Sequence, residues 1–387
     1  MMQRLAPVFA AAPLVLACIL LPLARALPAW MGPEGSQLPE PAVHGLWFAL
    51  AWLGALGALF QKSKGPSSFL SRGLLLAVFT LGLFLYAAPA LQQLRPTPLW
   101  IPELTPPAFL LLAWLWASTF GPPPRKAFLI CGAILGALCA ADFLLALLQG
   151  GGSLPPARLG RTGPLSCMLL VCLCAGLRAQ DEPEFKGTDH WLALTVLGLT
   201  ACLARMALFT AGWALLFFGP GSRLRRSGAF VLCLLLVGTS LLLPLDASAL
   251  LTLSDQPRQW LAVLHSLDRV PWGLLTGLPL GAVLPPDAAP DPSPLLMAMG
   301  HRAALRLPDI QVFWLRLTAG FGLAATPLAL GALALPVLRR PTAFGAGVFA
   351  SCLTLGLVTD LFYTPGPAVL TVLALYSAFS LPQNPRP

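Results

Sequence analysis

Charged residues are scarce in this chain. Asp, Glu, Lys and Arg make up only 10% of its 387 residues, whereas a soluble globular domain has about 25%. So few ionisable groups cannot cover a soluble surface of this size, which excludes a large aqueous catalytic domain. With 57% hydrophobic residues the chain cannot be disordered either. The mean hydropathy of +0.78 favours a polytopic membrane protein that folds as a single transmembrane domain over residues 1–387.

The sequence also lacks the motifs of common nucleotide and metal chemistry. It has no Walker motif, no HExxH and no GxSxG, and its glycine triplet at 150–152 follows an expected helix rather than a strand. All nine cysteines fall within apolar runs, where we interpret them as small packing residues. We therefore expect no metal and no other cofactor. The net charge of +9 points to anionic membrane lipids as partners, not to nucleic acid.

Apolar runs recur from one end of the sequence to the other. A spanning helix needs about 20 mostly apolar residues. About twelve runs meet or approach this length, and they cover residues 5–23, 43–60, 73–91, 107–120, 127–149, 163–177, 190–204, 206–219, 228–244, 311–336, 343–360 and 366–382. The sequence thus predicts an all-α membrane protein with about 12 transmembrane helices and one large outer loop, residues 245–310, between helices 9 and 10.

The seventh and eighth runs are separated only by Arg205. One long tilted helix with a buried arginine is a possible interpretation of this segment. We favour two helices, because about 30 residues is too long for one ordinary span.

The placement of Lys and Arg predicts the orientation of the chain. With Arg4 in the cytoplasm, every lysine falls on the inner side and every cation on the outer side is an arginine. An even number of spans then puts both termini in the cytoplasm. The alternative for the first run is a secretory signal that is cleaved near Ala24 to Ala26. We favour a span, because the apolar stretch is long for a signal and its removal would leave an odd number of spans.

The outer loop at 245–310 concentrates polar residues. It contains two of the four histidines, His265 and His301. A long loop in a compact protein is usually functional or disordered, and this one has a signal of order. A helix-start pattern at 254–257 precedes apolar residues at helical spacing, namely Trp260, Val263, Leu264 and Leu267. The pattern predicts a short amphipathic helix that lies on the membrane surface or caps a cavity.

Arginines recur at the expected outer ends of the spans. Arg158 and Arg161 flank a Gly/Pro-rich loop at 150–164, Arg205 lies at the turn between spans seven and eight, and Arg316 lies near the start of span ten. Arginine binds phosphate oxygens through two parallel hydrogen bonds, so these residues point to a diphosphate or acidic-glycan ligand. The alternative is that each arginine only anchors to lipid headgroups.

Asp142 is the clearly intramembrane carboxylate, in the outer half of the run 127–149. An ionisable group inside a membrane is a functional candidate by default. A structural hydrogen bond to a neighbouring helix is an equally good explanation of this residue.

Four short segments, together with the layout of spans, are similar to those of a known family. The segments are Arg161-Thr-Gly-Pro-Leu before span six, Ala204-Arg205-Met-Ala-Leu at the seven/eight turn, Asp255-Gln-Pro-Arg258-Gln-Trp260 followed by Pro271 and Gly277-Leu-Pro-Leu-Gly281, and the stretch from Asp309 to Gly320. They resemble motifs of the O-antigen ligase and O-antigen polymerase superfamily, which are glycosyltransferases of the bacterial inner membrane.

The resemblance implies an enzyme that moves a glycan from a polyprenyl-diphosphate carrier to the hydroxyl of a lipid or glycan acceptor. The reaction would take place at the periplasmic face, invert the anomeric configuration and need no metal. Within this interpretation, the catalytic residues are Asp309, Arg258 and Arg205. The substrate-binding residues are Arg161, Arg158, His301, His265, Arg316 and Asp142.

One position departs from the ligase pattern. The ligases have a histidine, the proposed catalytic base, where this sequence has Asp309. A carboxylate can accept the proton of a sugar hydroxyl if an apolar setting raises its pKa, and His301 or His265 could supply an imidazole instead. With this departure, the chain could also be a polymerase-like member or an inactive relative of the superfamily. The competing class of protein is a polytopic transporter.

Overall fold

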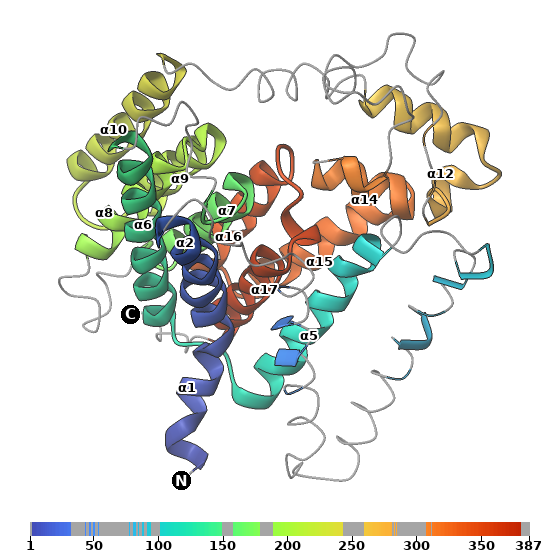
Figure 1. The fold of residues 1–387 in the computed structure, drawn as a ribbon, viewed down its shortest axis with the longest axis horizontal. Coiled ribbons are helices and arrows are strands. Elements are labelled where there is room, and N and C mark those ends of the chain that lie inside the picture. The colour runs from blue at the N-terminus through green and yellow to red at the C-terminus, as the bar shows by residue number, and fades with distance from the viewer. Residues whose placement is uncertain are drawn as a thin grey trace.

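The computed structural model describes residues 2–31, 101–148, 158–178, 189–242, 259–280, 307–310 and 312–380, with isolated residues between 43 and 93 and residues 282 and 284. Every regular element in these ranges is helical (Figure 1). This confirms the all-α class. The expected spans 43–60 and 73–91 lie for the most part outside the described residues.

Most of the described helices coincide with the apolar runs of the sequence. Their bounds, in chain order, are α1 (Met2–Val15), η1 (Leu16–Leu20), α2 (Leu21–Met31), η3 (Ile101–Leu104), α5 (Thr105–Phe120), α6 (Arg125–Leu148), α7 (Thr162–Cys174), α8 (Asp189–Ala201), α9 (Arg205–Phe218), α10 (Arg223–Leu242), α12 (Gly273–Thr276), η7 (Leu307–Asp309), α14 (Phe313–Phe321), α15 (Ala325–Arg339), α16 (Ala343–Leu355), η8 (Leu361–Tyr363) and α17 (Pro365–Ser380). Prolines lie in the first turn of α5 and α17, where the missing N–H costs nothing.

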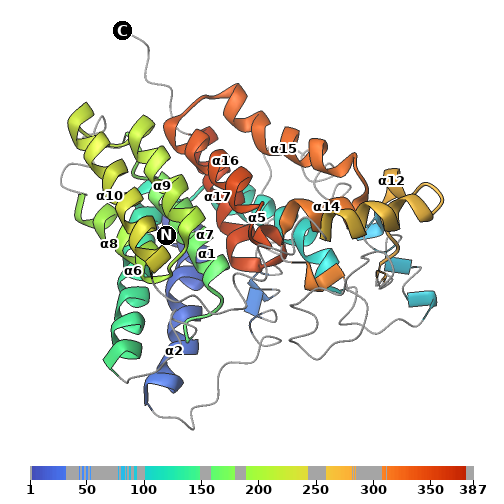
Figure 2. The ribbon, with the colours of Figure 1, turned by 90° about the horizontal axis from the view of Figure 1, so that it is seen from above.

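Helix α7 lies at the centre of the molecule. Every residue from Leu165 to Cys174 is buried. In both views α8, α9 and α10 lie to one side of it, and α12 and α14 lie at the opposite side (Figures 1 and 2). All nine cysteines are buried and none forms a disulfide, as expected for small packing residues.

The helices that follow one another in the chain from α5 to α10 alternate in direction. Arg125 begins α6 and donates hydrogen bonds to the carbonyls of Ala175 and Leu177, just after the end of α7, so these two helices are antiparallel. Helices α6 and α8 therefore run parallel to each other. They also lie very close together, because a side chain at Gly136 would overlap the backbone of Leu194 and one at Gly198 would overlap Gly136. Small residues allow such close contacts between apolar helices.

Two described helices have the length and composition of membrane spans. They are the segment Phe9–Pro28 and α6, Arg125–Leu148. Five shorter helices are apolar: Thr162–Cys174, Arg205–Phe218, Ala325–Arg339, Ala343–Leu355 and Pro365–Phe379. Length and composition are weak evidence for insertion, because a buried core helix or a signal sequence has the same properties. The number of spans therefore stays a prediction.

The break at Arg205 is present as expected. Helix α8 ends at Ala201, Leu203 adopts a left-handed conformation with a φ of 52°, and Arg205 begins α9. The segment is therefore two helices and not one long tilted helix.

The run at 311–336 is not one helix, which corrects the expectation of a single span there. Helix α14 ends at Phe321, and Gly322 has a φ of 84°. The reason is a contact with the outer loop, since the amide of Leu323 donates to the carbonyl of Leu274 at 2.8 Å and the amide of Leu278 donates to that of Ala319 at 2.7 Å. Those bonds replace helical ones and divide the run.

The outer loop contains the expected amphipathic helix. Residues 259–269 are helical, Val263 and Leu267 are fully buried, and Leu261 and Leu264 are exposed. The buried face joins a small core of its own, separate from the core of the bundle, with Leu278, Leu307, Ile310, Val312, Leu315 and Ala319. The described part of the loop is thus docked on α14.

Candidate functional site

Polar side chains gather at one end of the helical bundle. Helices α5, α7, α9, α14 and α17 all begin there. We call it the arginine end, and it comprises residues 101–105, 158–162, 202–205, 307–316 and 359–365. Helix N-termini carry a partial positive charge and unpaired backbone N–H groups. With the arginines, they make this end of the molecule favourable for an anion.

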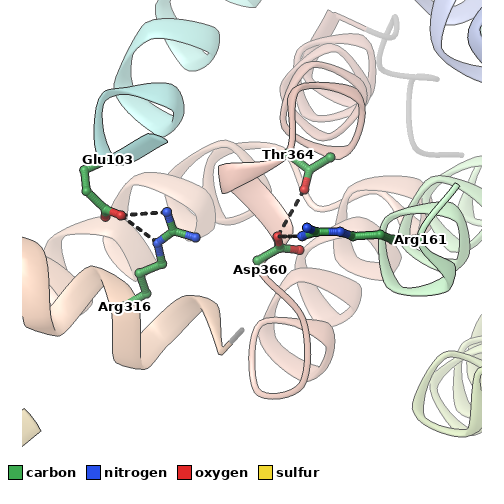
Figure 3. Close-up of polar contacts among 5 residues, drawn as sticks. All are labelled: Glu103, Arg161, Arg316, Asp360 and Thr364. Atoms are coloured by element: carbon green, nitrogen blue, oxygen red, sulfur yellow. Dashed lines mark hydrogen bonds and ion pairs between the residues drawn. The ribbon is translucent and has the colours of Figure 1, made fainter. Parts of the chain in front are cut away.

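Arg161 and Asp360 form an ion pair at the surface of the arginine end. The Nη1 atom of Arg161 lies 3.8 Å from Oδ2 of Asp360, and the hydroxyl of Thr364 donates to the same oxygen at 3.3 Å (Figure 3). The Arg161 side chain is 72% exposed and that of Asp360 only 16%. A separation of 3.8 Å is too long for a hydrogen bond, so the guanidinium keeps donors for another acceptor.

A second ion pair is buried close by. Nε and Nη2 of Arg316 donate to Oε1 of Glu103 at 3.0 and 2.6 Å (Figure 3). The guanidinium also lies 3.8 Å from the centroid of the Tyr363 ring. Burial raises the pKa of the Glu103 carboxyl above its ordinary value, and the Arg316 guanidinium and the Tyr363 hydroxyl act in the opposite direction. This pair ties the segment before α5 to α14 and η8.

An apolar cavity adjoins the arginine end. It has a volume of about 650 Å³ and lies between α5, α14, α15 and α17. Phe313, Phe362 and Pro106 line it and come from the segments that hold the two ion pairs. Arg339 lines it from the last turn of α15. Helix α15 packs loosely, with Leu333 its only buried residue. A cavity of this shape and chemistry suits a hydrocarbon chain.

Arg205 is at the arginine end and donates two hydrogen bonds to Ser240. Its Nη2 donates to the carbonyl of Ser240 at 2.7 Å and its Nε to the hydroxyl of the same residue at 3.2 Å. The arginine therefore ties the start of α9 to the end of α10. Arg158 is half-buried in the segment before α7, and Arg25 of α2 lies against the neighbouring Gly160.

Asp142 is completely buried in α6. Its Oδ1 accepts a hydrogen bond of 2.8 Å from the indole of Trp30 on α2. Its Oδ2 has no hydrogen-bond partner among the residues that the structure describes. The structural explanation of this carboxylate, a bond to a neighbouring helix, is thus present in the molecule, and one oxygen is left over.

The remaining candidates are only partly described. Asp309 ends η7, whose backbone contacts η3 and so lies beside the segment of Glu103, but its side chain is outside the described part. His265 is exposed on the loop helix. Arg258 and His301 lie outside the described residues. The structure therefore brings Arg161, Arg316 and the Asp309 turn to one end of the bundle.

Sequence reasoning missed Glu103, Asp360 and Tyr363. Each lies within a few residues of an expected outer span end, in a short connection that carries no motif. A useful signal was available, because acidic residues are rare in this chain and both carboxylates lie at the expected outer ends of apolar runs, where the arginines also lie.

No protein family, curated protein or solved structure matches this chain. The resemblance to the O-antigen ligase and polymerase superfamily therefore depends on the short motifs and the predicted layout of spans.

Within the described residues, no group of three or more His, Cys, Asp or Glu side chains could hold a metal ion.

Proposed function

We propose that this chain is a multi-pass protein of the bacterial inner membrane, with both termini in the cytoplasm. Its arginine end would face the periplasm. There it would transfer a polyprenyl-diphosphate-linked glycan to the hydroxyl of a lipid or glycan acceptor, as an O-antigen ligase does. The observation that carries the proposal is the exposed Arg161 with its partner Asp360, two residues before Phe362, which lines an apolar cavity between helices.

The presence of an exposed cation and an apolar cavity at the same end of the bundle supports a lipid-linked anion as the substrate. The cavity between α5, α14, α15 and α17 would hold part of the polyprenyl chain. Arg161, which is exposed and only loosely paired, would bind the diphosphate. The alternating directions of the helices support insertion, because successive spans of a polytopic protein must cross in opposite senses.

The chemistry follows from these groups. The acceptor oxygen attacks the anomeric carbon from the side opposite the phosphate, the bond from that carbon to the diphosphate oxygen breaks, and the configuration inverts. Arg161 would stabilise the negative charge that develops on the leaving diphosphate. The proton of the acceptor hydroxyl would pass to a carboxylate, and Asp309 and Asp360 are the candidates at this end. The docked outer loop would limit the access of water.

One experiment distinguishes the proposed ligase function from two alternative functions. A polymerase would use the same donor and the same groups with a growing glycan as acceptor. A transporter without transferase activity is favoured by Asp142, because a buried carboxylate with one unpaired oxygen among the described residues is typical of ion-coupled transport.

The test is deletion of the gene in its own host, followed by analysis of surface glycan and of glycan on the polyprenyl carrier. A ligase predicts loss of a surface glycan with long chains retained on the carrier. Accumulation of single repeat units would indicate a polymerase. Two unchanged pools would contradict the proposal and favour transport. Complementation with Arg161→Ala should fail, and the matched control Arg223→Ala, at the opposite end of the bundle, should succeed.

A further inference from the structure

A second cavity lies along α8, α9 and α10. Its volume is about 490 Å³. Its charged residues lie where α8 and α10 begin and α9 ends, which is the end of the bundle opposite to Arg205. Apart from Thr200, the rest of its wall is apolar and includes Leu192, Val196, Leu197, Ala229, Leu232 and Leu236. The cavity is therefore a hydrocarbon groove with a charged mouth.

The mouth of this groove has an excess of positive charge. Arg225 pairs with Asp189, with 3.0 Å between Nη2 and Oδ2. Arg226 also lines the mouth, and its Nε is shielded from solvent with no hydrogen-bond acceptor among the described residues. Buried guanidinium N–H groups are normally satisfied. An acceptor oxygen that arrives with the ligand would satisfy this one and balance the charge.

We propose that this groove binds one anionic phospholipid of the cytoplasmic leaflet. The lipid phosphate would accept from Arg226, and an acyl chain would lie between α8 and α10. The cytoplasmic leaflet holds the anionic lipids that attract arginines near its surface. The inference depends on the proposed insertion and orientation, and it does not depend on glycan transfer.

Native mass spectrometry of the full chain from detergent micelles tests the site. The protein is offered equal amounts of phosphatidylglycerol and phosphatidylcholine. One retained phosphatidylglycerol per chain, preferred by about fivefold or more, is expected from one arginine contact near a membrane surface. Arg226→Gln should remove this preference. Arg223→Gln removes the same charge from an exposed residue that does not line the groove, and it should leave the preference unchanged.

A second variant keeps the test valid if Arg226→Gln fails to fold. Ala193 lines the groove and is exposed, so Ala193→Phe fills the groove without disturbing the core. This variant should lose the retained lipid while keeping every charge. Equal retention of both lipids, or retention unaffected by Ala193→Phe, would overturn the proposal. If inorganic phosphate displaces the retained lipid equally well from the wild type and from Ala193→Phe, the site binds free anions and not a lipid. No glycan is present, so failure here is separate from failure of the transferase proposal.

Discussion

The Arg316 guanidinium donates two hydrogen bonds to one carboxylate oxygen of Glu103, which lies 213 residues earlier in the chain. The two side chains are 4% and 0% exposed. A buried pair of this kind fixes two segments relative to each other, whereas its net contribution to stability is often small. Here it fixes the start of α14 against the segment before α5, next to the surface ion pair of Arg161. We assign it a structural role.

Removal of one partner of this pair should be costly. Glu103→Leu leaves the Arg316 guanidinium buried without its acceptor, and we expect a loss of about 3–5 kcal/mol in the free energy of unfolding. Glu103→Leu combined with Arg316→Met should recover most of this loss, because no buried charge remains. Thermal unfolding in detergent checks both variants. If the double variant is stable but cannot complement a deletion strain, Arg316 binds substrate and the structural assignment is wrong.

The pH dependence of Arg316→Met follows from the pKa of Glu103. Burial already raises that pKa, and the variant removes the guanidinium that opposes the rise. A carboxyl whose pKa is higher in the folded state contributes stability below its unfolded pKa, and this contribution is lost as the pH rises through the folded pKa. The melting temperature of Arg316→Met should therefore fall between about pH 5 and pH 8. Glu103→Leu with Arg316→Met is the control and should show no such fall. Parallel pH profiles would contradict the assignment.

Gly277 should be indispensable for docking of the outer loop. Its φ of 81° with a ψ of −176° belongs to a region that only glycine adopts readily, and an added Cβ would overlap the backbone of Gly320. Gly277→Ala should cost about 1–3 kcal/mol from conformation alone, and it should speed proteolysis of the loop. Gly331→Ala is the matched control, since a Cβ there meets open space in α15. That control should be neutral or stabilise by about 0.5–1 kcal/mol. Equal proteolysis of the two variants would argue against the docked loop.

The apolar cavity can be filled without loss of charge. Ala332 lines it, whereas Leu338 on the same helix is 77% exposed and does not. Ala332→Phe should reduce complementation of a deletion strain by tenfold or more, on the order of 1.4 kcal/mol, because the lipid chain loses its place. Leu338→Phe should complement fully. Comparable complementation by both variants would contradict the proposal that this cavity binds the lipid chain.

Local patterns predicted the local structure well. The loop helix at 259–269 was predictable because its apolar residues recur at helical spacing, and the division at Arg205 because the combined run was too long for one span. The burial of the cysteines followed from their apolar neighbours. These features depend on residues within one or two turns of each other.

Long-range contacts defeated the same reasoning. The run at 311–336 is apolar throughout, and its break at Gly322 depends on hydrogen bonds to Leu274 and Leu278, which no local pattern encodes. The partner of Arg316 could not be found for the same reason, since Glu103 stands in a different part of the sequence. The contact of Arg205 with Ser240, 35 residues later, was likewise not predictable, and the role of Arg205 toward substrate stays a prediction.

Reconstituted transfer is the most direct test of the central claim. The purified chain in proteoliposomes is given polyprenyl-diphosphate-linked glycan and acceptor from the host, and the transferred glycan and released polyprenyl diphosphate are measured. The proposed function predicts both products with the wild type and with Arg223→Gln. It predicts a loss of at least tenfold with Arg161→Gln, on the order of 1.4 kcal/mol. Absence of both products with the wild type, or full activity of Arg161→Gln, would contradict it.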